Sequence, residues 1–317
     1  MAVEGAPFSA EGEGENGVLQ IALQFLTRNM PERDRNVVPE SSLLHTAVAA
    51  LRARKATPWA RGVPLPVFLN WVLPYRHLDE PFDDWRTAFY EALSPLVANA
   101  TSTSEAAQIV NRRVWGLFHD PPIFFKPDQT PEIMSPGQVA AAGFASCTGL
   151  SIFLASACRA VGVPARIAGT PCWASRGQGG GSSSSSSSGG GGSSSGGGSS
   201  SGGGSISGGG GVFGSSGGGA ARERFNNHNW VEVWDGGAWS FTGAAEYEPR
   251  GLNRTWFFPR PAKDAVPGSQ RHAIFAAAFA PTPGSHFPLA WAPDDSTVPG
   301  LDVTEAYLTA TVPRGLT

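Results

Sequence analysis

Hydrophobic and polar positions in the first third of the chain recur with the spacing of a helix. Between residues 17 and 118, apolar side chains fall three and four positions apart, which places them on one face. The pattern is clearest in the stretches 41–54, 84–98 and 105–118. We therefore expect a helical extension over residues 17–120, interrupted by a proline-punctuated loop.

The pattern changes after Gly143. Apolar residues from Leu150 to Val161 again follow helical spacing, and the sequence Gly-Val-Pro that begins at Gly162 ends this helix. Residues 165–170 are typical of a short strand. Aromatic and β-branched runs at 229–234 and 238–242 flank an Asp-Gly-Gly turn, which predicts a hairpin. Helices followed by strands indicate an α+β fold.

The last part of the chain, residues 261–317, alternates short apolar runs with prolines. We expect a β-rich C-terminal segment there, with strands at 274–279 and 287–291. It ends without an obvious terminal element, which leaves open a continuation of the chain beyond Thr317.

Two segments lack any hydrophobic pattern. Of the 43 residues from Gly177 to Gly219, 22 are Gly and 17 are Ser, so we expect a disordered insert at 177–219. Residues 1–16 contain acidic residues and no basic one, which predicts a disordered tail and does not fit a secretory signal.

Charge and composition exclude several classes of protein. The net charge is −3 and Lys and Arg form no cluster, which argues against a nucleic-acid surface and a polybasic membrane anchor. No apolar run approaches the ~20 residues that a bilayer requires. The three cysteines lack zinc-ligand spacing, and there is no phosphate loop or dinucleotide motif. We expect a cytoplasmic protein with reduced thiols and without metal or cofactor; the oligomeric state stays open.

Cys147 is the first candidate for chemistry, because it stands at the start of the helix that precedes Gly162. The helix dipole favours a thiolate there and should lower its pKa, and free N–H groups of the first turn could bind an oxyanion. His228 opens the first hairpin strand and is a candidate base. From these residues alone, a small hydrophobic core residue remains the alternative for Cys147.

Three sequence blocks sharpen this hypothesis. They are Cys147-Thr148-Gly149-Leu150-Ser151, the run from Cys158 to Arg166, and His228-Asn229-Trp230-Val231-Glu232-Val233-Trp234. In this order and at these spacings they resemble the transglutaminase-like family of papain-type fold, over residues 137–249 without the insert. The resemblance implies a core at 121–260 in which a nucleophile helix packs on an antiparallel sheet. It also implies that Cys147 is the nucleophile and His228 its base.

The chain departs from the family at one position. The family supplies an Asp on the second hairpin strand to orient the His, and Gly243 stands there instead. We predict that Glu246, three residues further on, orients His228; the alternative is a turn-capping or salt-bridging group near Arg250. Asn227 and Trp230 are candidate substrate contacts, with core packing as the alternative for Trp230.

Two functions follow from these residues. One is a cysteine enzyme that acts by thioester acyl transfer or hydrolysis on amide bonds of protein or peptide substrates. The other is a catalytically degenerate transglutaminase-like domain that serves as a peptide-binding or scaffold module. The residues do not separate transfer to an amine from transfer to water.

Overall fold

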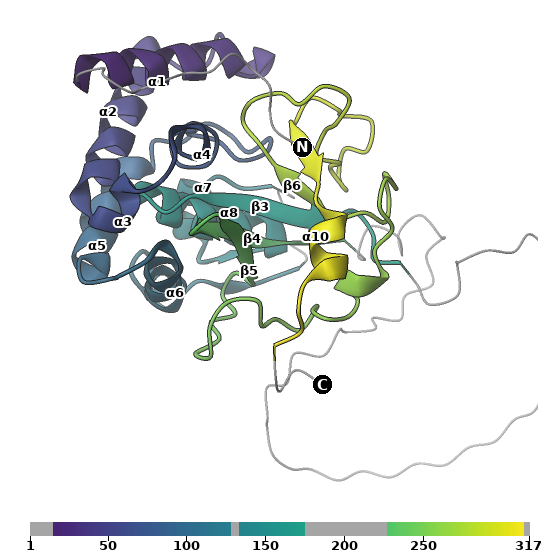
Figure 1. Cartoon of the computed structure of the whole chain (residues 1–317). Helices are drawn as coiled ribbons and strands as arrows, with labels where there is room; N and C mark the ends of the chain where they lie inside the picture. The colour runs from purple at the N-terminus through teal and green to yellow at the C-terminus, as the bar shows by residue number, and fades with distance from the viewer. Residues whose placement is uncertain (1–14, 128–132, 175–226, 314–317) are drawn as a thin grey trace, which may run out of the picture.

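The computed structural model describes residues 15–127, 133–174 and 227–313 of the chain (Figure 1). The insert predicted at 177–219 lies outside these residues, and so does most of the tail predicted at 1–16. Helix α1 (Glu15–Asn29) begins at the last two residues of that tail.

A five-stranded sheet occupies the centre of the fold. Its strands are β3 (Ala165–Thr170), β4 (His228–Asp235), β5 (Ala238–Thr242), β6 (Phe275–Ala277) and β7 (Gly300–Asp302). They lie in the order β5-β4-β3-β6-β7, and every neighbouring pair is antiparallel. The predicted hairpin is confirmed as β4 and β5. Its turn uses Gly236 and Gly237 at φ of 56° and 97°, a conformation that favours glycine.

Helix α8 (Cys147–Ala160) packs on one face of this sheet, as the sequence predicts. All its residues from Thr148 to Ala160 are buried. Strand residues with alternate spacing, such as Ile167, Val231 and Val233, face this helix. Helices α5 (Arg86–Val97), α6 (Thr103–Arg113) and α7 (Pro136–Ala142) contact it, and α5 and α6 share its core. The α+β class and the packing of the nucleophile helix are therefore confirmed.

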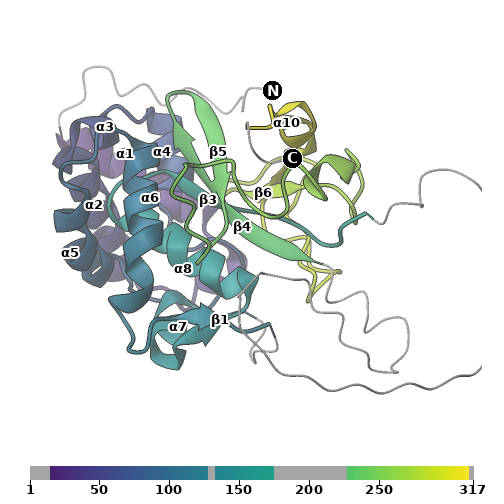
Figure 2. The ribbon, with the colours of Figure 1, turned by 90° about the horizontal axis from the view of Figure 1, so that it is seen from below.

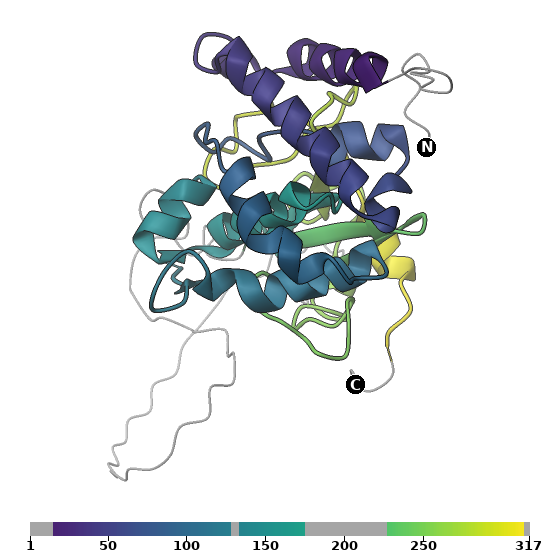
Figure 3. The same cartoon turned by 90° about the vertical axis from the view of Figure 1, so that its left-hand side faces the viewer.

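The helices of the N-terminal region are α1, α2 (Glu40–Ala56), α3 (Pro58–Arg61), α4 (Leu65–Trp71), α5 and α6, with short 3-10 turns at Glu32–Asp34 and Val114–Gly116. They do not all cover the same face of the sheet: α5 and α6 pack with α8, whereas Trp71 of α4 contacts Trp239 and Arg166 on the opposite face (Figures 2 and 3). The helix expected from residue 105 begins at Thr103, because the Ser102 hydroxyl accepts the Glu105 N–H and caps it.

The opposite face of the sheet is covered by the C-terminal segment. An aromatic cluster fills the space between this face and the C-terminal segment; it contains Trp173, Trp230, Phe241, Phe257, Phe258 and Tyr307. Tyr307 belongs to α10 (Thr304–Thr309), a short helix that the sequence pattern did not predict. The strand predicted at 287–291 is wrong, because this stretch contributes only isolated bridges. Pro288 and Pro293 lack the N–H groups that a sheet ladder requires. A 3-10 turn spans Ala262–Asp264.

A buried polar group joins α10 to the central strands. Arg166 on β3 lies opposite Glu232 on β4, and its Nε donates to Glu232 Oε2 over 2.6 Å. The Tyr307 hydroxyl donates to Glu232 Oε1 and accepts from Trp230 Nε1, both at 2.6 Å. Glu232 is thus the acceptor on which this network depends.

Substitution of this acceptor should destabilise the fold. Glu232→Gln leaves the buried Arg166 cation without its counter-charge, so we expect a loss of about 3–5 kcal/mol in the free energy of unfolding. Urea denaturation measures it. The control is Glu32→Gln in the exposed ion pair with Arg35, which should leave the unfolding midpoint unchanged. Equal midpoints for the two variants would contradict a stabilising role of the network.

Candidate functional site

Cys147 lies at the first position of α8, where the chain turns out of a short strand. Strand β2 (Phe144–Ala145) pairs in parallel with β1 (Phe124–Phe125) and leads into Ser146. The Ser146 hydroxyl caps α8 by accepting the Gly149 N–H. Cys147 is partly exposed, whereas Cys158, further along the same helix, is buried. Cys147 therefore combines a helix N-terminus with access from the surface.

Four hydrogen-bonding groups act on the Cys147 thiol, and each lowers its pKa: the backbone N–H of Asn229, the side chain of Thr148, and the backbone N–H groups of Thr148 and of Cys147 itself. Burial has the larger effect and raises this pKa above its ordinary value. The net direction is thus opposite to the lowered pKa that the helix dipole alone predicts, because desolvation disfavours the charged sulfur.

His228 lies at the first position of β4, on the face of the sheet opposite α8. Aromatic rings surround its imidazole: the centroid of Trp256 lies 4.9 Å away and that of Phe257 5.2 Å. Its Nε2 is buried and has no hydrogen-bond partner among the residues that the structure describes. This burial lowers the pKa of His228 to about 3, so the imidazole is neutral at physiological pH.

The structure brings Cys147 and His228 together through the backbone. The thiol lies against the N–H of Asn229, the residue that follows His228. Among the described residues no hydrogen bond joins the thiol and the imidazole directly. Both groups are neutral and the imidazole lies on the face of the sheet opposite α8, so the described residues contain no preformed thiolate–imidazolium pair.

Glu246 folds back onto Gly243. A Cβ atom placed on Gly243 would lie 2.0 Å from Glu246 Oε2, so the carboxylate fills the space of a side chain at position 243. Ala245, at φ of 60°, makes the turn that returns the chain. Thr242 lies opposite Val231, and strand alternation therefore puts Gly243 on the same face as His228. Burial raises the pKa of this carboxyl.

In the described parts of the chain, no hydrogen bond joins the Glu246 carboxylate to the His228 imidazole. Its Oε1 accepts a hydrogen bond of 3.2 Å from Trp256 Nε1, and the Trp256 ring lies against His228. Trp256 is 56% exposed and is thus a large aromatic side chain at the surface of the site. The role predicted for Glu246 stays a prediction.

The two candidate substrate contacts differ in exposure. Asn227 is partly exposed, immediately before β4. Trp230 is completely buried, stacks on Trp173 at 5.7 Å, and uses its indole N–H to bond Tyr307. We correct the expectation for Trp230 on this ground, because a side chain without exposed surface packs beneath the site and does not contact a substrate.

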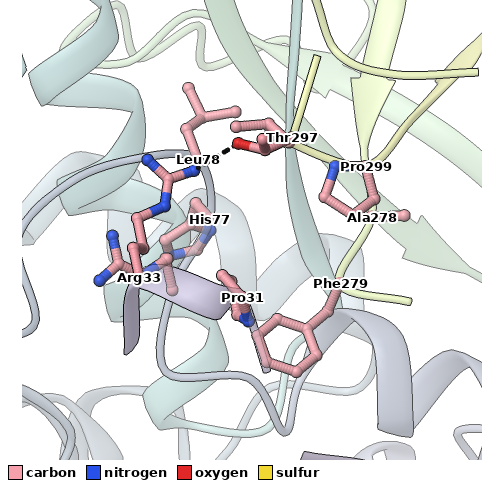
Figure 4. A pocket seen from close by; sticks show the side chains of 10 residues that line it. Pro31, Arg33, His77, Leu78, Ala278, Phe279, Thr297 and Pro299 are labelled. Carbon is pink, nitrogen blue, oxygen red and sulfur yellow. Dashed lines mark hydrogen bonds between the residues drawn. The ribbon is translucent and has the colours of Figure 1, made fainter. Parts of the chain in front are cut away.

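A small pocket lies elsewhere in the fold, between the N-terminal helices and the C-terminal segment (Figure 4). Arg33, His77, Phe279 and Thr297 help to line it, and Arg33 donates to the Thr297 hydroxyl. None of the candidate catalytic residues belongs to it. Among the residues that the structure describes, no group of three or more His, Cys, Asp or Glu could hold a metal ion.

Comparison with known families agrees with this geometry. Residues 92–243 match the transglutaminase-like superfamily, so the chain contains a transglutaminase-like domain. The matched range includes Cys147, His228 and Gly243. It begins within α5, before residue 121, where the sequence places the start of the core. Searches of curated proteins and of solved structures gave no match.

No helix in the described parts of the chain has both the length and the apolar character needed to cross a bilayer.

Two residues near Cys147 and His228 were not predicted from the sequence as part of the site. Asn229 bonds Thr148 over 2.8 Å beside the thiol, and Trp256 lies between Glu246 and His228. A signal existed for Asn229, since a polar residue at that strand position must face α8. None existed for Trp256, because a loop of irregular structure carries it.

The pKa directions predict how Cys147 reacts with iodoacetamide. The thiolate is the reacting form, and the pKa of Cys147 is raised, so the labelling rate should increase steadily from pH 5 to pH 9. Peptide mapping at each pH measures it. Cys158, whose pKa burial raises to about 12, serves as the unlabelled control. A labelling rate that is already maximal at pH 5 would instead reveal a thiolate–imidazolium pair.

Proposed function

We propose that the chain is a cysteine enzyme that transfers or hydrolyses acyl groups of amide bonds in protein or peptide substrates. Cys147 is the nucleophile and His228 the base. One observation carries this proposal: the thiol at the start of α8 lies against the residue that follows His228, within a transglutaminase-like domain. All three cysteines are free, and a reducing compartment such as the cytoplasm would keep them so.

The first step is attack of the Cys147 sulfur on an amide carbonyl carbon, while the thiol proton passes to His228. The low pKa keeps the imidazole in its neutral form but also makes it a weak base, so transfer of the thiol proton requires a group that stabilises the imidazolium. The backbone N–H groups of Cys147 and Thr148, which hydrogen-bond the thiol in the resting chain, stabilise the oxyanion once the sulfur has attacked. Collapse of the tetrahedral intermediate expels the amine, which takes its proton from His228 and leaves a thioester on Cys147.

The second step releases the acyl group. Water or an amine, deprotonated by His228, attacks the thioester carbon, and the sulfur leaves with a proton. Water gives a hydrolase, and an amine gives a transglutaminase. The buried Nε2 of His228 requires a partner when the ring becomes positively charged. We propose Glu246 for this role, because its carboxylate occupies the space of the side chain that Gly243 lacks.

A catalytically degenerate peptide-binding domain is the second candidate. A specific observation favours it: among the described residues the buried Nε2 of His228 has no hydrogen-bond partner, and Glu246 Oε1 accepts from Trp256 instead. In that case the exposed Trp256 would serve to bind peptides.

Removal of the nucleophile separates these two functions. Cys147→Ala should abolish both amine incorporation into casein and ammonia release, while the thermal midpoint stays unchanged because the side chain is partly exposed. A fluorescent primary amine reports the first activity and coupled ammonia detection the second. Cys172→Ala is the control and should keep both activities. Activity that survives in Cys147→Ala would exclude Cys147 as the nucleophile.

The relation between Gly243 and Glu246 predicts a rescue. Glu246→Ala should lower turnover by up to about 10⁴-fold, the loss typical of a catalytic His without its carboxylate. Gly243→Asp alone places a side chain onto the Glu246 carboxylate and should destabilise the fold. The double variant Gly243→Asp/Glu246→Ala removes this clash and returns a carboxylate to the family position, so it should recover turnover relative to Glu246→Ala.

The matched control for this rescue is Gly243→Ala/Glu246→Ala, which fills the same space without a charge and should remain inactive. Turnover of Glu246→Ala equal to that of the natural chain would show that Glu246 does not orient His228.

A further inference from the structure

Asn229 directs three of its four polar groups toward the first turns of α8, and the fourth, Oδ1, lies over Gly169. Its side-chain Nδ2 donates to Thr148 Oγ1 over 2.8 Å, and its carbonyl accepts from the Ser151 hydroxyl over 3.1 Å. Its backbone N–H donates to the Cys147 thiol. Asn229 is 5% exposed, so these bonds are shielded from water. One strand residue thus bonds three residues of α8, namely Cys147, Thr148 and Ser151.

Thr148 connects the Asn229 amide to the sulfur. Its hydroxyl oxygen accepts from Asn229 Nδ2, and its side chain in turn hydrogen-bonds the Cys147 thiol. A hydroxyl that accepts from an amide must direct its own hydrogen elsewhere, because it has a single hydrogen to donate. The Asn229 amide therefore orients the Thr148 hydroxyl as a donor to the sulfur.

Gly169 on β3 provides the space for this amide. A Cβ atom on Gly169 would lie 2.0 Å from Asn229 Oδ1 and 2.8 Å from the His228 carbonyl oxygen. Gly169 lies opposite Asn229 in the β3–β4 pair. Glycine is therefore required at this position because any side chain would collide with Asn229, and not because of its backbone conformation.

Contacts between α8 and β4 matter because Cys147 and His228 are not held together by closeness in the sequence. Cys147 and His228 are 81 residues apart in sequence, on different elements. A displacement of about 1 Å between reacting groups can reduce a rate by about 10²-fold. The distance between helix and strand must therefore be fixed by contacts, and Asn229 supplies three of them.

We propose that Asn229 is a positioning residue that acts through Thr148: seated over Gly169, its side-chain amide aims the Thr148 hydroxyl at the Cys147 sulfur and holds the His228 strand against the nucleophile helix. This inference rests on the proposed function, and extends it, because it assigns stabilisation of the developing thiolate to donors other than His228.

The test uses the full-length chain and iodoacetamide, so that it requires no substrate. Thr148→Val removes the hydroxyl donor but keeps the shape of the side chain. Loss of a hydrogen bond to a charged sulfur should lower the labelling rate of Cys147 at pH 8 by about 10-fold. Asn229→Ala leaves the hydroxyl without its orienting amide and should produce most of this loss. Thr148→Ser, which restores a hydroxyl, should recover the rate relative to Thr148→Val.

The double variant Asn229→Ala/Thr148→Val provides the decisive comparison. Since the amide acts through the hydroxyl, the double variant should label no more slowly than Thr148→Val. The matched control is Ser156→Ala, which removes a buried hydrogen bond to His77 from the same helix and should leave labelling unchanged. Circular dichroism of each variant reports whether stability, as opposed to thiol reactivity, has changed.

The possible outcomes distinguish this inference from the proposed function. A labelling rate of Asn229→Ala equal to that of Ser156→Ala would overturn the positioning role, and so would losses that multiply in the double variant. Turnover that persists in Cys147→Ala would overturn the proposed function instead, without affecting the labelling result.

Discussion

The enclosure of helix α8 is the constraint on which the rest of the structure depends. Every residue of this helix after Cys147 is buried, between the sheet on one side and helices α5 and α6 on the other. A close-packed helix cannot shift without opening cavities, so its first residue has a fixed position. Cys147 is therefore held by the core, although the residue itself is partly exposed.

Burial of the whole helix requires that its polar groups find partners within the protein. Ser146 caps the first turn, and Arg86 donates to the carbonyl of Arg159 at the other end. Further along the helix, the Ser151 hydroxyl donates to the carbonyl of Asn229, on the strand that carries His228. The same hydrogen bonds that satisfy the buried helix thus connect the start of α8, which carries Cys147, to the strand that carries His228.

The face of the sheet that carries His228 has a different character. The aromatic cluster around Trp230 excludes water from the imidazole, which lowers the pKa of His228, and burial also raises the pKa of Cys147. Both shifts favour neutral groups, so in the proposed mechanism the thiol proton moves only as the sulfur attacks. A buried carboxylate near Gly243 would then stabilise the imidazolium as it forms.

The sequence was sufficient for the elements with strong periodicity. Helix α8 and the β4–β5 hairpin follow from helical spacing and an Asp-Gly turn, and their packing follows from the family resemblance. Helix α10 was missed because six residues are too few to show a period, and the strand at 287–291 failed because of its prolines. The fold-back of Glu246 depends on a left-handed Ala245, and alanine gives no signal for that conformation.

In the proposed mechanism, Cys147 forms a thioester that His228 helps to resolve. Mass spectrometry of the chain after mixing with p-nitrophenyl acetate tests it most directly. We predict an acetyl group on Cys147 that forms and disappears in the natural chain, and that accumulates in His228→Ala because deacylation lacks its base. Acetylation of Cys172 in place of Cys147, or equal lifetimes of the acetyl group with and without His228, would contradict the account.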